Sequence, residues 1–378
     1  MRICHITSMH EWDDDRIFQR ACKGLSAEGI DVDLIATSGE SPDAGEMGAI
    51  RFIPLARREG LRRRFLSSFE AYRLALSTPA DIFHFHDPDL LPFMWRLKAR
   101  GRRVVYDIHE NYSIRFAQWG VPARVARSLS RVYRWLEDRV ISTIDGIVVP
   151  AVGMKERVGT RAHESVVVRN MHSIRRVAPL IDGPHIRSGR PVVYTSGSNG
   201  PDRNCLSIVR SLPAVRAQFP SVQFRFAGSV RPDGYQETLE KEAEAFGVSG
   251  ALDFQPQLPY LEHFRRTMEA DVGLVLLERN EKNLAATSNR MFEYMMCGIP
   301  IVVEDLPEQR QVVDDAECGL LVDSRDVDEL AAAITRLLAD EKLALRLGAN
   351  GYQAARQRYN FESDLVGLLA FYDRVLSR

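Results

Sequence analysis

Short apolar runs alternate with amphipathic stretches along the whole of this 378-residue chain. The runs have the length of buried strands, and the stretches between them place apolar residues at helical spacing. This alternation predicts an α/β protein whose helices cover parallel sheets. The expected strands are residues 2–8, 32–36, 82–86, 104–108, 146–150 and 166–169 in the first half, and 192–195, 224–227, 251–254, 272–277, 299–303 and 319–322 in the second.

A segment rich in Pro and Gly, residues 179–191, interrupts the alternation and predicts a domain boundary. We expect one doubly wound, Rossmann-like domain over residues 1–182 and a second over residues 190–360, each with about six parallel strands. The last segment, residues 361–378, is amphipathic and is expected to pack back on the first domain. Two such domains facing one another across a cleft would bind ligands beyond the carboxyl ends of their strands.

Composition is typical of soluble proteins, with 45% hydrophobic and 27% charged residues. No apolar run approaches the roughly 20 residues that span a bilayer. A strand-like run over residues 2–6 stands where a signal peptide would begin. The five cysteines are odd in number and form no CxxC pair, which favours a reducing compartment. We therefore expect a cytoplasmic protein.

Positive charge is concentrated in the first half of the chain. Residues 1–182 contain 28 Lys and Arg against 23 Asp and Glu, whereas residues 183–378 contain 22 against 28. A solvated face or a peripheral contact with an anionic inner-membrane surface would explain this excess. Nucleic acid is not an expected partner, because stacking aromatics are not interleaved with the arginines. The arginines form a cluster and a helical stripe, namely Arg57, Arg58, Arg62, Arg63 and Arg64, and Arg124, Arg127, Arg131 and Arg134.

The segment TSNRMFEYMMCGIPIVV, residues 287–303, reads as a polar loop, a short helix and a buried strand. Ser288 can cap the helix, which leaves amides of its first turn to hold an anion. Glu293 follows on the same helix, and Gly298 ends it. A diphosphate at the helix start and a carboxylate binding two ribose hydroxyls would fit this arrangement. The alternative is an ordinary turn between helix and strand with a surface glutamate.

A second glycine-containing turn, GSNG, follows the first expected strand of the second domain. Gly197, Ser198 and Asn199 would let backbone amides approach a phosphate. Arg203 can supply a fixed positive charge beside it. Such a turn is common, so on its own it indicates little.

Polar residues also follow the expected strands of the first domain. His84 and His86 project from one face of a strand, and Asp87 comes next. This spacing lacks the third and fourth ligands of a zinc site, so we expect no metal there. His109 ends the next strand and could donate a hydrogen bond to a substrate hydroxyl, or serve a structural role.

The first loop, residues 9–15, has no G-x-G-x-x-G sequence, which argues against a dinucleotide-binding dehydrogenase. Asp15 and Arg16 stand where this loop enters a helix. Asp15 could simply cap that helix while Arg16 is solvated.

Four segments in order together resemble the retaining glycosyltransferases of family 4, which have the GT-B architecture of two Rossmann-like domains. They are CHITSMHEWDDDRIFQR, FHFHDPDLLP, VVYDIHENY, and SNRMFEYMMCGIPIVV followed by GLLVD. The resemblance extends over nearly the whole chain. It implies an α/β fold of the GT-B type and transfer of a sugar from a nucleoside diphosphate donor.

The resemblance also implies roles for individual residues. Glu293 matches the glutamate that binds the donor ribose, and His109 matches a histidine that contacts the transferred sugar. On the donor side, the matching residues are Gly197, Ser198, Asn199, Arg203, Thr287, Ser288, Asn289 and Arg290 around the diphosphate, and Gln257 and Leu258 near the base. On the acceptor side, they are Asp15, Arg16, His86, Asp87, His109 and Tyr112.

Two positions depart from the family pattern. The family often has a second glutamate eight residues before the ribose-binding one, and Ala285 stands there in this chain. The backbone amides of residues 283–287 would then contact the sugar instead. Asn204 follows Arg203 where the family usually has Gly or a second cation.

The reaction implied is retaining transfer of a hexose-type sugar from a UDP- or GDP-linked donor to a glycan or lipid-linked hydroxyl, as in cell-surface polysaccharide synthesis. His109, Arg203 and Glu293 are the expected catalytic residues. Neither a cofactor nor a metal ion is expected. Cationic side chains and the start of a helix would supply the positive charge that a metal ion would otherwise provide. The alternatives are a nucleotide-sugar epimerase or hydrolase, and a non-catalytic subunit that binds a nucleotide sugar.

Overall fold

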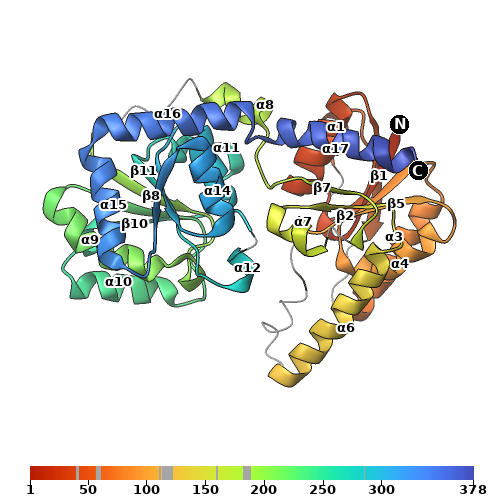
Figure 1. The fold of residues 1–378 in the computed structure, drawn as a ribbon, viewed down its shortest axis with the longest axis horizontal. Helices are drawn as coiled ribbons and strands as arrows, with labels where there is room; N and C mark the ends of the chain where they lie inside the picture. Colours follow the sequence, from red (N-terminus) through yellow and green to blue (C-terminus); the bar gives the residue numbers. More distant parts are fainter. Residues whose placement is uncertain are drawn as a thin grey trace. The chain divides into compact units, whose positions relative to one another are not determined.

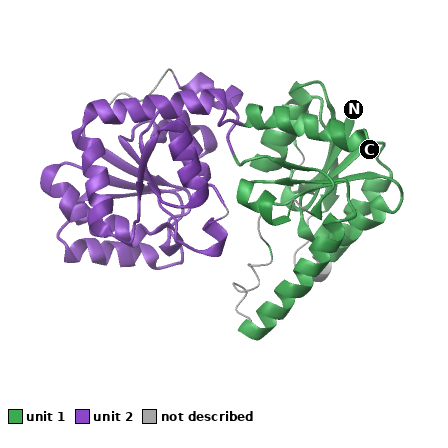
Figure 2. Ribbon diagram, viewed as in Figure 1, with its two compact units in different colours: residues 1–170, 361–378 green, residues 171–360 purple. Residues whose placement is uncertain are grey.

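The computed structural model describes residues 1–39, 42–56, 61–109, 112, 122–158, 161–181, 189–284 and 286–378. The chain divides into two compact units, coloured separately in Figure 2. Unit 1 comprises Met1–Asn170 and Phe361–Arg378, and unit 2 comprises Met171–Asn360. The boundary thus precedes the Pro- and Gly-rich segment. The reason is that residues after Asn170, among them Met171, are buried in the apolar core of unit 2.

Unit 1 contains a seven-stranded sheet in which every pairing is parallel (Figure 1). Its strand order is β3-β2-β1-β4-β5-β6-β7. The order of connection reverses between β1 and β4, where ligands bind in doubly wound sheets. The strands are β1 (Arg2–Glu11), β2 (Asp31–Ser38), β3 (Arg51–Ala56), β4 (Ile82–Phe85), β5 (Arg103–Asp107), β6 (Gly146–Val149) and β7 (Ser165–Val167).

The sequence did not predict β3. This strand pairs only with β2, at the edge of the sheet, and most of its residues are half-buried or exposed. It includes Pro54, which an edge strand tolerates because its outer side needs no backbone donor. An edge position with little burial therefore explains why no apolar run marks the strand.

Unit 2 contains a six-stranded parallel sheet with the order β10-β9-β8-β11-β12-β13. This repeats the order of the first six strands of unit 1, so the equivalent reversal lies between β8 and β11. The strands are β8 (Val192–Ser196), β9 (Gln223–Ala227), β10 (Leu252–Gln255), β11 (Val272–Val275), β12 (Ile301–Glu304) and β13 (Gly319–Val322).

Helices connect the strands of both sheets. Among the described residues, those of unit 1 are η1 (Asp15–Cys22), α1 (Lys23–Ala27), α2 (Ala44–Met47), α3 (Leu61–Leu76), η2 (Pro88–Leu90), α4 (Leu91–Lys98), α6 (Ala123–Ile141), α7 (Val152–Val158) and α17 (Phe361–Leu376). Those of unit 2 are α8 (Ile174–Val177), η5 (Ala178–Leu180), η6 (Pro201–Arg203), α9 (Cys205–Gln218), α10 (Tyr235–Ala245), η7 (Ser249–Ala251), α11 (Tyr260–Thr267), α12 (Glu281–Leu284), α13 (Asn289–Met296), α14 (Pro307–Ala316), α15 (Val327–Ala339) and α16 (Glu341–Gln357).

Each sheet has an apolar core on both of its faces. Successive strand residues point to opposite faces, so Ile3 joins one core of unit 1 and Cys4 joins the other. In unit 2, Val193 and Tyr194 divide between two cores in the same way. Both units are therefore three-layered, with a sheet between two layers of helices.

The C-terminal helix α17 packs on the sheet of unit 1. Its buried face includes Leu365, Phe371 and Tyr372. A Cβ atom on Gly146 of β6 would lie 2.6 Å from the Phe371 ring, so only glycine permits this approach. Among the described helices, none is both long enough and apolar enough to cross a membrane.

Candidate functional site

The first turn after β8 is held against the loop after β9. Gly197 adopts a left-handed conformation, with φ of 83°. A Cβ atom on Gly228 would lie 2.1 Å from the carbonyl oxygen of Gly197, so the two backbones meet where no side chain fits. Asn199 donates its backbone N–H to Ser229 at 2.8 Å. The glycine-containing turn is thus a fixed element at the carboxyl end of a central strand.

Arg290, in the first turn of α13, reaches this turn from the other side. Its guanidinium donates to Thr195 Oγ1 at 2.8 Å and to the carbonyl of Ser198 at 3.1 Å. The side chain is buried, so these bonds fix its position. Two segments that the sequence assigned to the diphosphate, about 90 residues apart, therefore meet.

Arg203 lies close enough to Arg290 for their charges to interact. Burial, together with the positive charge of Arg290, lowers the pKa of Arg203. Its Nε atom is buried and makes no hydrogen bond among the described residues, although a carboxylate oxygen of Asp202 lies 3.6 Å away. Two guanidiniums held near one another are stabilised by an anion between them.

Ser288 occupies the position before the first turn of α13, but its side chain makes no capping hydrogen bond. The capping role suggested by the sequence is therefore wrong, because the backbone amides of the first turn do not donate a hydrogen bond to the Ser288 hydroxyl. Ser288 and Thr287 are half-buried, and Asn289 is exposed. Ala285 lies outside the described residues.

Glu293, one turn after Arg290, is held by two histidines. One carboxylate oxygen lies 3.1 Å from Nε2 of His172, and the other lies 2.9 Å from Nε2 of His263. Burial alone would raise the pKa of the Glu293 carboxyl, but these two hydrogen bonds outweigh it and lower that pKa well below its ordinary value. The glutamate is therefore not the solvated surface residue of the alternative interpretation.

His172 and His263 were not among the site residues predicted from the sequence. They lie 121 and 30 residues from Glu293, on a loop and on α11. Only the fold brings them together, so no local spacing could have revealed them.

Gln257 and Leu258, expected near the donor base, follow strand β10. Gln257 is exposed and Leu258 is half-buried. Strand β10 forms the edge of the sheet, separated from β8 by β9. These two residues are thus displaced by two strands from the turn at Gly197.

In unit 1, Arg16 is bound by the carboxyl end of β5. Its guanidinium donates to both oxygens of Asp107, at 2.7 and 3.1 Å, and also to the side chain of Asn170. It is therefore not the solvated residue that the alternative interpretation supposed. The helix is capped by Asp14, which accepts two backbone N–H bonds, and Asp15 pairs instead with Arg20. The suggested capping role of Asp15 is wrong by one position.

A chain of imidazoles links β1 to the residues that follow β4 and β5. Nδ1 of His5 lies 2.9 Å from Nε2 of His86, and Nδ1 of His86 lies 3.1 Å from Nε2 of His109. The carboxylate of Asp107 lies 3.4 Å from the second histidine and 3.5 Å from the third. Burial lowers the pKa of His86 to about 3, so the ring is neutral at neutral pH. His109 is thus attached to a buried polar network that fixes its orientation.

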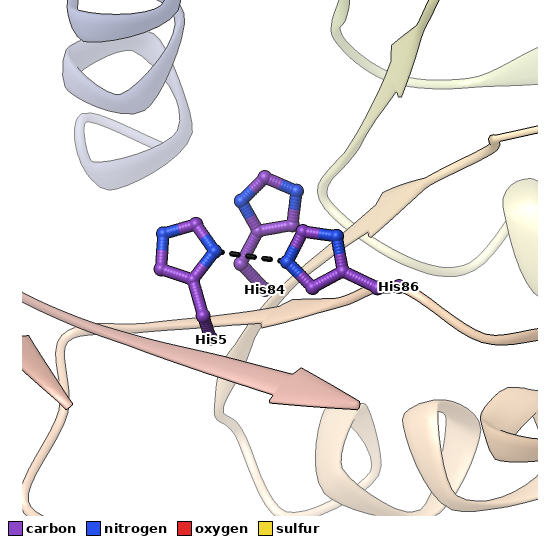
Figure 3. Close-up of side chains that lie close together, drawn as sticks. All are labelled: His5, His84 and His86. Carbon is purple, nitrogen blue, oxygen red and sulfur yellow. Dashed lines mark hydrogen bonds between the residues drawn. The ribbon is translucent and has the colours of Figure 1, made fainter. Parts of the chain in front are cut away.

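His84 completes a group of three buried histidines with His5 and His86, shown in Figure 3. One nitrogen of each lies within 4.8 Å of the others, so the fold supplies the third imidazole that the local spacing lacked. Nitrogens around a tetrahedral metal lie about 3.3 Å apart, whereas His5 and His86 are hydrogen-bonded at 2.9 Å. Both nitrogens of His84 lie on the side of its ring away from that bond, and Nδ1 bonds the Tyr372 hydroxyl at 2.6 Å. A hydrogen-bonded network describes this geometry better than a converging ligand set.

Asp107 belongs to a second group that could supply metal ligands, with His86 and His109. Its carboxylate is already bound at both oxygens by Arg16. Burial would raise the pKa of Asp107, but the positive charge of Arg16 holds it well below the ordinary value. The arginine therefore occupies the position that a cation would take.

Asp87 also has its partners inside unit 1. It accepts hydrogen bonds from the Thr7 hydroxyl at 2.7 Å and the Ser8 amide at 2.6 Å, and His10 lies 3.0 Å away. Burial opposes ionisation, but the hydrogen bonds from His10 and Thr7 lower the pKa of Asp87 to about 2. This carboxylate fixes the loop after β1.

Tyr112, the remaining residue predicted on the acceptor side, is half-buried.

Helix α6 projects from the rest of unit 1 in Figure 1 and carries the expected arginine stripe. The stripe consists of exposed side chains, Arg124, Arg127, Arg131 and Arg134. Large apolar side chains are exposed on the same helix, namely Val125, Leu129, Val132, Trp135 and Leu136. Of the other arginine cluster, Arg57 and Arg58 lie outside the described residues.

Family models match both units of the chain. One described as "Glycosyl transferases group 1" matches residues 180–354, and one described as "Glycosyl transferase 4-like domain" matches residues 15–171.

Named proteins and a solved structure are also similar to the chain. A phosphatidyl-myo-inositol mannosyltransferase of Mycolicibacterium smegmatis is 22% identical over 360 residues, which cover 91% of this chain and 82% of the relative. A GDP-mannose-dependent alpha-(1-6)-phosphatidylinositol monomannoside mannosyltransferase of the same organism is 27% identical over 176 residues, which cover 46% of this chain and 45% of the relative. The structure of a sucrose-phosphate synthase from Thermosynechococcus elongatus matches with a TM-score of 0.75 at 17% identity, covering 100% of this chain and 99% of that one.

The chain is therefore a glycosyltransferase, and its two parallel-sheet units have the GT-B fold. The sequence-based prediction of two Rossmann-like domains is confirmed, and so is the prediction of a glycosyltransferase enzyme.

Proposed function

We propose that this enzyme transfers a sugar, with retained anomeric configuration, from a UDP- or GDP-linked donor to a hydroxyl of a glycan or lipid-linked acceptor. The observation that carries the proposal is the pair of guanidiniums, Arg203 and Arg290, held beside the first turn of α13. Cell-surface polysaccharide or glycoconjugate synthesis is the process that such a transfer would serve.

The donor would bind to unit 2 through its charged groups. Its diphosphate would bind to the two arginines, to the Gly197 turn and to the backbone amides at the start of α13. Its ribose would bind the carboxylate of Glu293, which stays ionised because its pKa is lowered. One relative is named as GDP-mannose-dependent, which supports a nucleotide sugar as donor.

In the reaction, the bond from the anomeric carbon to the diphosphate oxygen breaks while the acceptor oxygen bonds to the same face of that carbon. The acceptor proton passes to the departing phosphate oxygen. Negative charge grows on the diphosphate as it leaves, and Arg203 and Arg290 stabilise it. These guanidiniums would supply the positive charge that other transferases take from a metal, so we expect metal-independent turnover. His109 would orient the sugar through its link to His86.

The acceptor side is assigned to unit 1. His109 follows β5, Arg16 binds the carboxyl end of that strand, and two of the relatives are named for phosphatidylinositol-linked acceptors. Exposed arginines alternate with exposed apolar residues on α6, a composition that suits an anionic membrane surface. A cytoplasmic location with peripheral contact at the inner membrane face would place a lipid-linked acceptor within reach.

A panel of nucleotide sugars tests the proposal. Thermal shift identifies the donors that bind, and mass spectrometry then follows the products formed with glycan and lipid-linked acceptors. We expect transfer for the wild type and a loss of about a hundredfold in turnover for Arg203→Ala and Glu293→Ala. The control is Arg325→Ala, because Arg325 is exposed on unit 2.

Each alternative function has its own outcome in this assay. Conversion of the donor without transfer would indicate an epimerase or hydrolase. Donor binding without turnover across the acceptor panel would indicate a non-catalytic subunit. Wild-type activity in both the Arg203 and the Glu293 variants would refute the assigned site.

A further inference from the structure

Two histidines hold the carboxylate of Glu293 from different directions. His172 comes from the loop before α8, and His263 comes from α11. The ring of His172 is itself fixed, because Phe264 packs edge-on against it with ring centroids 5.3 Å apart. Its Nδ1 also lies 2.9 Å from the hydroxyl of Tyr260. The carboxylate therefore cannot rotate without losing both bonds.

The hydrogen-bonding roles in this group follow from the charge on the glutamate. An ionised carboxylate only accepts, so Nε2 of His172 and Nε2 of His263 must both carry a proton. The other nitrogen of His172 is then an acceptor, and the Tyr260 hydroxyl donates to it. The ring of His172 is thus held at both nitrogens, by the Tyr260 hydroxyl and by the Glu293 carboxylate.

The carboxylate keeps capacity for further donors. Its two oxygens offer about four acceptor positions, and the histidines take one on each oxygen. Among the described residues, the carboxylate has one further hydrogen-bonding contact, a long one at 3.5 Å from the Ser196 hydroxyl. The Glu293 side chain is 13% exposed, so its remaining edge can be reached. Each oxygen therefore has one acceptor position left, and together the two positions can accept hydrogen bonds from two hydroxyls on adjacent carbons.

We propose that His172 and His263 are positioning residues that orient Glu293 for two-point binding of a vicinal diol, the ribose of the nucleoside diphosphate. This inference rests on the proposed function and deepens it. Its consequence is that the enzyme selects ribonucleotides over 2′-deoxyribonucleotides. Losing one hydroxyl that bonds a carboxylate weakens binding by about tenfold or more.

Calorimetric titration of the 378-residue chain with UDP, GDP and their 2′-deoxy counterparts measures this selectivity. We expect the wild type to prefer the better ribonucleotide by about tenfold or more, and Glu293→Gln to lose that preference. His172→Leu and His263→Leu should also lose most of it, because the carboxylate is no longer oriented. His263→Gln should retain it, because the amide places an N–H donor where Nε2 stood. The matched control is His163→Leu, since His163 is exposed on unit 1.

The outcomes separate this inference from the function on which it rests. If both leucine variants keep the wild-type preference while Glu293→Gln loses it, the histidines do not orient the glutamate, although the donor site stands. If Glu293→Gln also keeps the preference, Glu293 does not bind the ribose and the proposed donor site fails.

A measurement on the unmodified protein serves if the leucine variants do not fold. Imidazole ¹⁵N–¹H correlation spectra should show the Nε2–H tautomer for both His172 and His263, with both signals shifting when the better nucleotide is added. The Nδ1–H tautomer at His263, or signals that ignore the nucleotide, would overturn the inference.

Discussion

The two units share one strand order but differ in the charge that they place at its reversal point. In unit 1 the end of the sheet holds the buried, neutral rings of His5 and His86, and its carboxylates are already bound by Arg16, by His10 or by backbone and hydroxyl donors. In unit 2 the equivalent place holds two guanidiniums, one with a buried Nε that makes no hydrogen bond among the described residues. We therefore propose that equal topology serves different ligands, with unit 2 suited to an anion and unit 1 to an acceptor with hydroxyl groups.

The largest expected effect concerns the cationic side of this comparison. Arg290→Ala should lower turnover of the best nucleotide sugar by about a hundredfold to a thousandfold, because the charge on the departing diphosphate loses a fixed partner. Steady-state kinetics checks this, with Arg325→Ala as the control. A loss of less than about threefold in Arg290→Ala would mean that unit 2 does not stabilise the leaving group through this residue.

A smaller effect is expected from the neutral side. His109→Ala should lower kcat by about tenfold to a hundredfold and leave the affinity for nucleoside diphosphate unchanged, because this histidine orients the sugar rather than the diphosphate. Kinetics and calorimetry on the same preparation separate the two quantities. Equal loss in both would place His109 among the diphosphate ligands and remove the contrast between the units.

The buried imidazoles of unit 1 also predict how stability depends on pH. Burial lowers the pKa values of His5, His84 and His86, so the unfolded chain binds protons that the folded protein does not. Stability should fall as pH drops below about 6.5, by about 1 kcal/mol per imidazole for each pH unit. Denaturant unfolding between pH 7.5 and 5 measures the slope. His163→Leu should keep it, and a flat profile in the wild type would contradict the neutral cluster.

The smallest effect concerns helix α6 of unit 1. Arg127→Ala and Arg131→Ala should each weaken binding to phosphatidylglycerol-containing vesicles by about fivefold, because both arginines are exposed on the stripe. Vesicle co-sedimentation measures this, with neutral phosphatidylcholine vesicles and Arg325→Ala as controls. If all variants bound these vesicles equally, the arginine stripe of α6 would be a solvated face and not a membrane contact.

Sequence patterns predicted the sheets well because burial on both faces produces continuous apolar runs. They failed for β3, an edge strand with little burial and a proline. Arg290 and Glu293 could be proposed because they lie on a recognisable short helix, and Arg203 could be proposed because it follows the glycine-containing turn.

Partners that come from distant segments could not be predicted. His5 joins His86 across 81 residues, and His172 joins Glu293 across 121. Such pairs depend on strand order and loop packing, for which a single sequence carries no local signal.

The most direct test of the contrast between the units is calorimetric titration of UDP and GDP into three forms of the protein. They are the wild type, the unit 2 variant Arg203→Ala/Arg290→Ala, and the unit 1 variant His86→Gln/His109→Gln. We predict that affinity for the better nucleotide falls by about a hundredfold in the unit 2 variant and stays at the wild-type value in the unit 1 variant. Wild-type affinity in the unit 2 variant, or a comparable loss in the unit 1 variant, would contradict it.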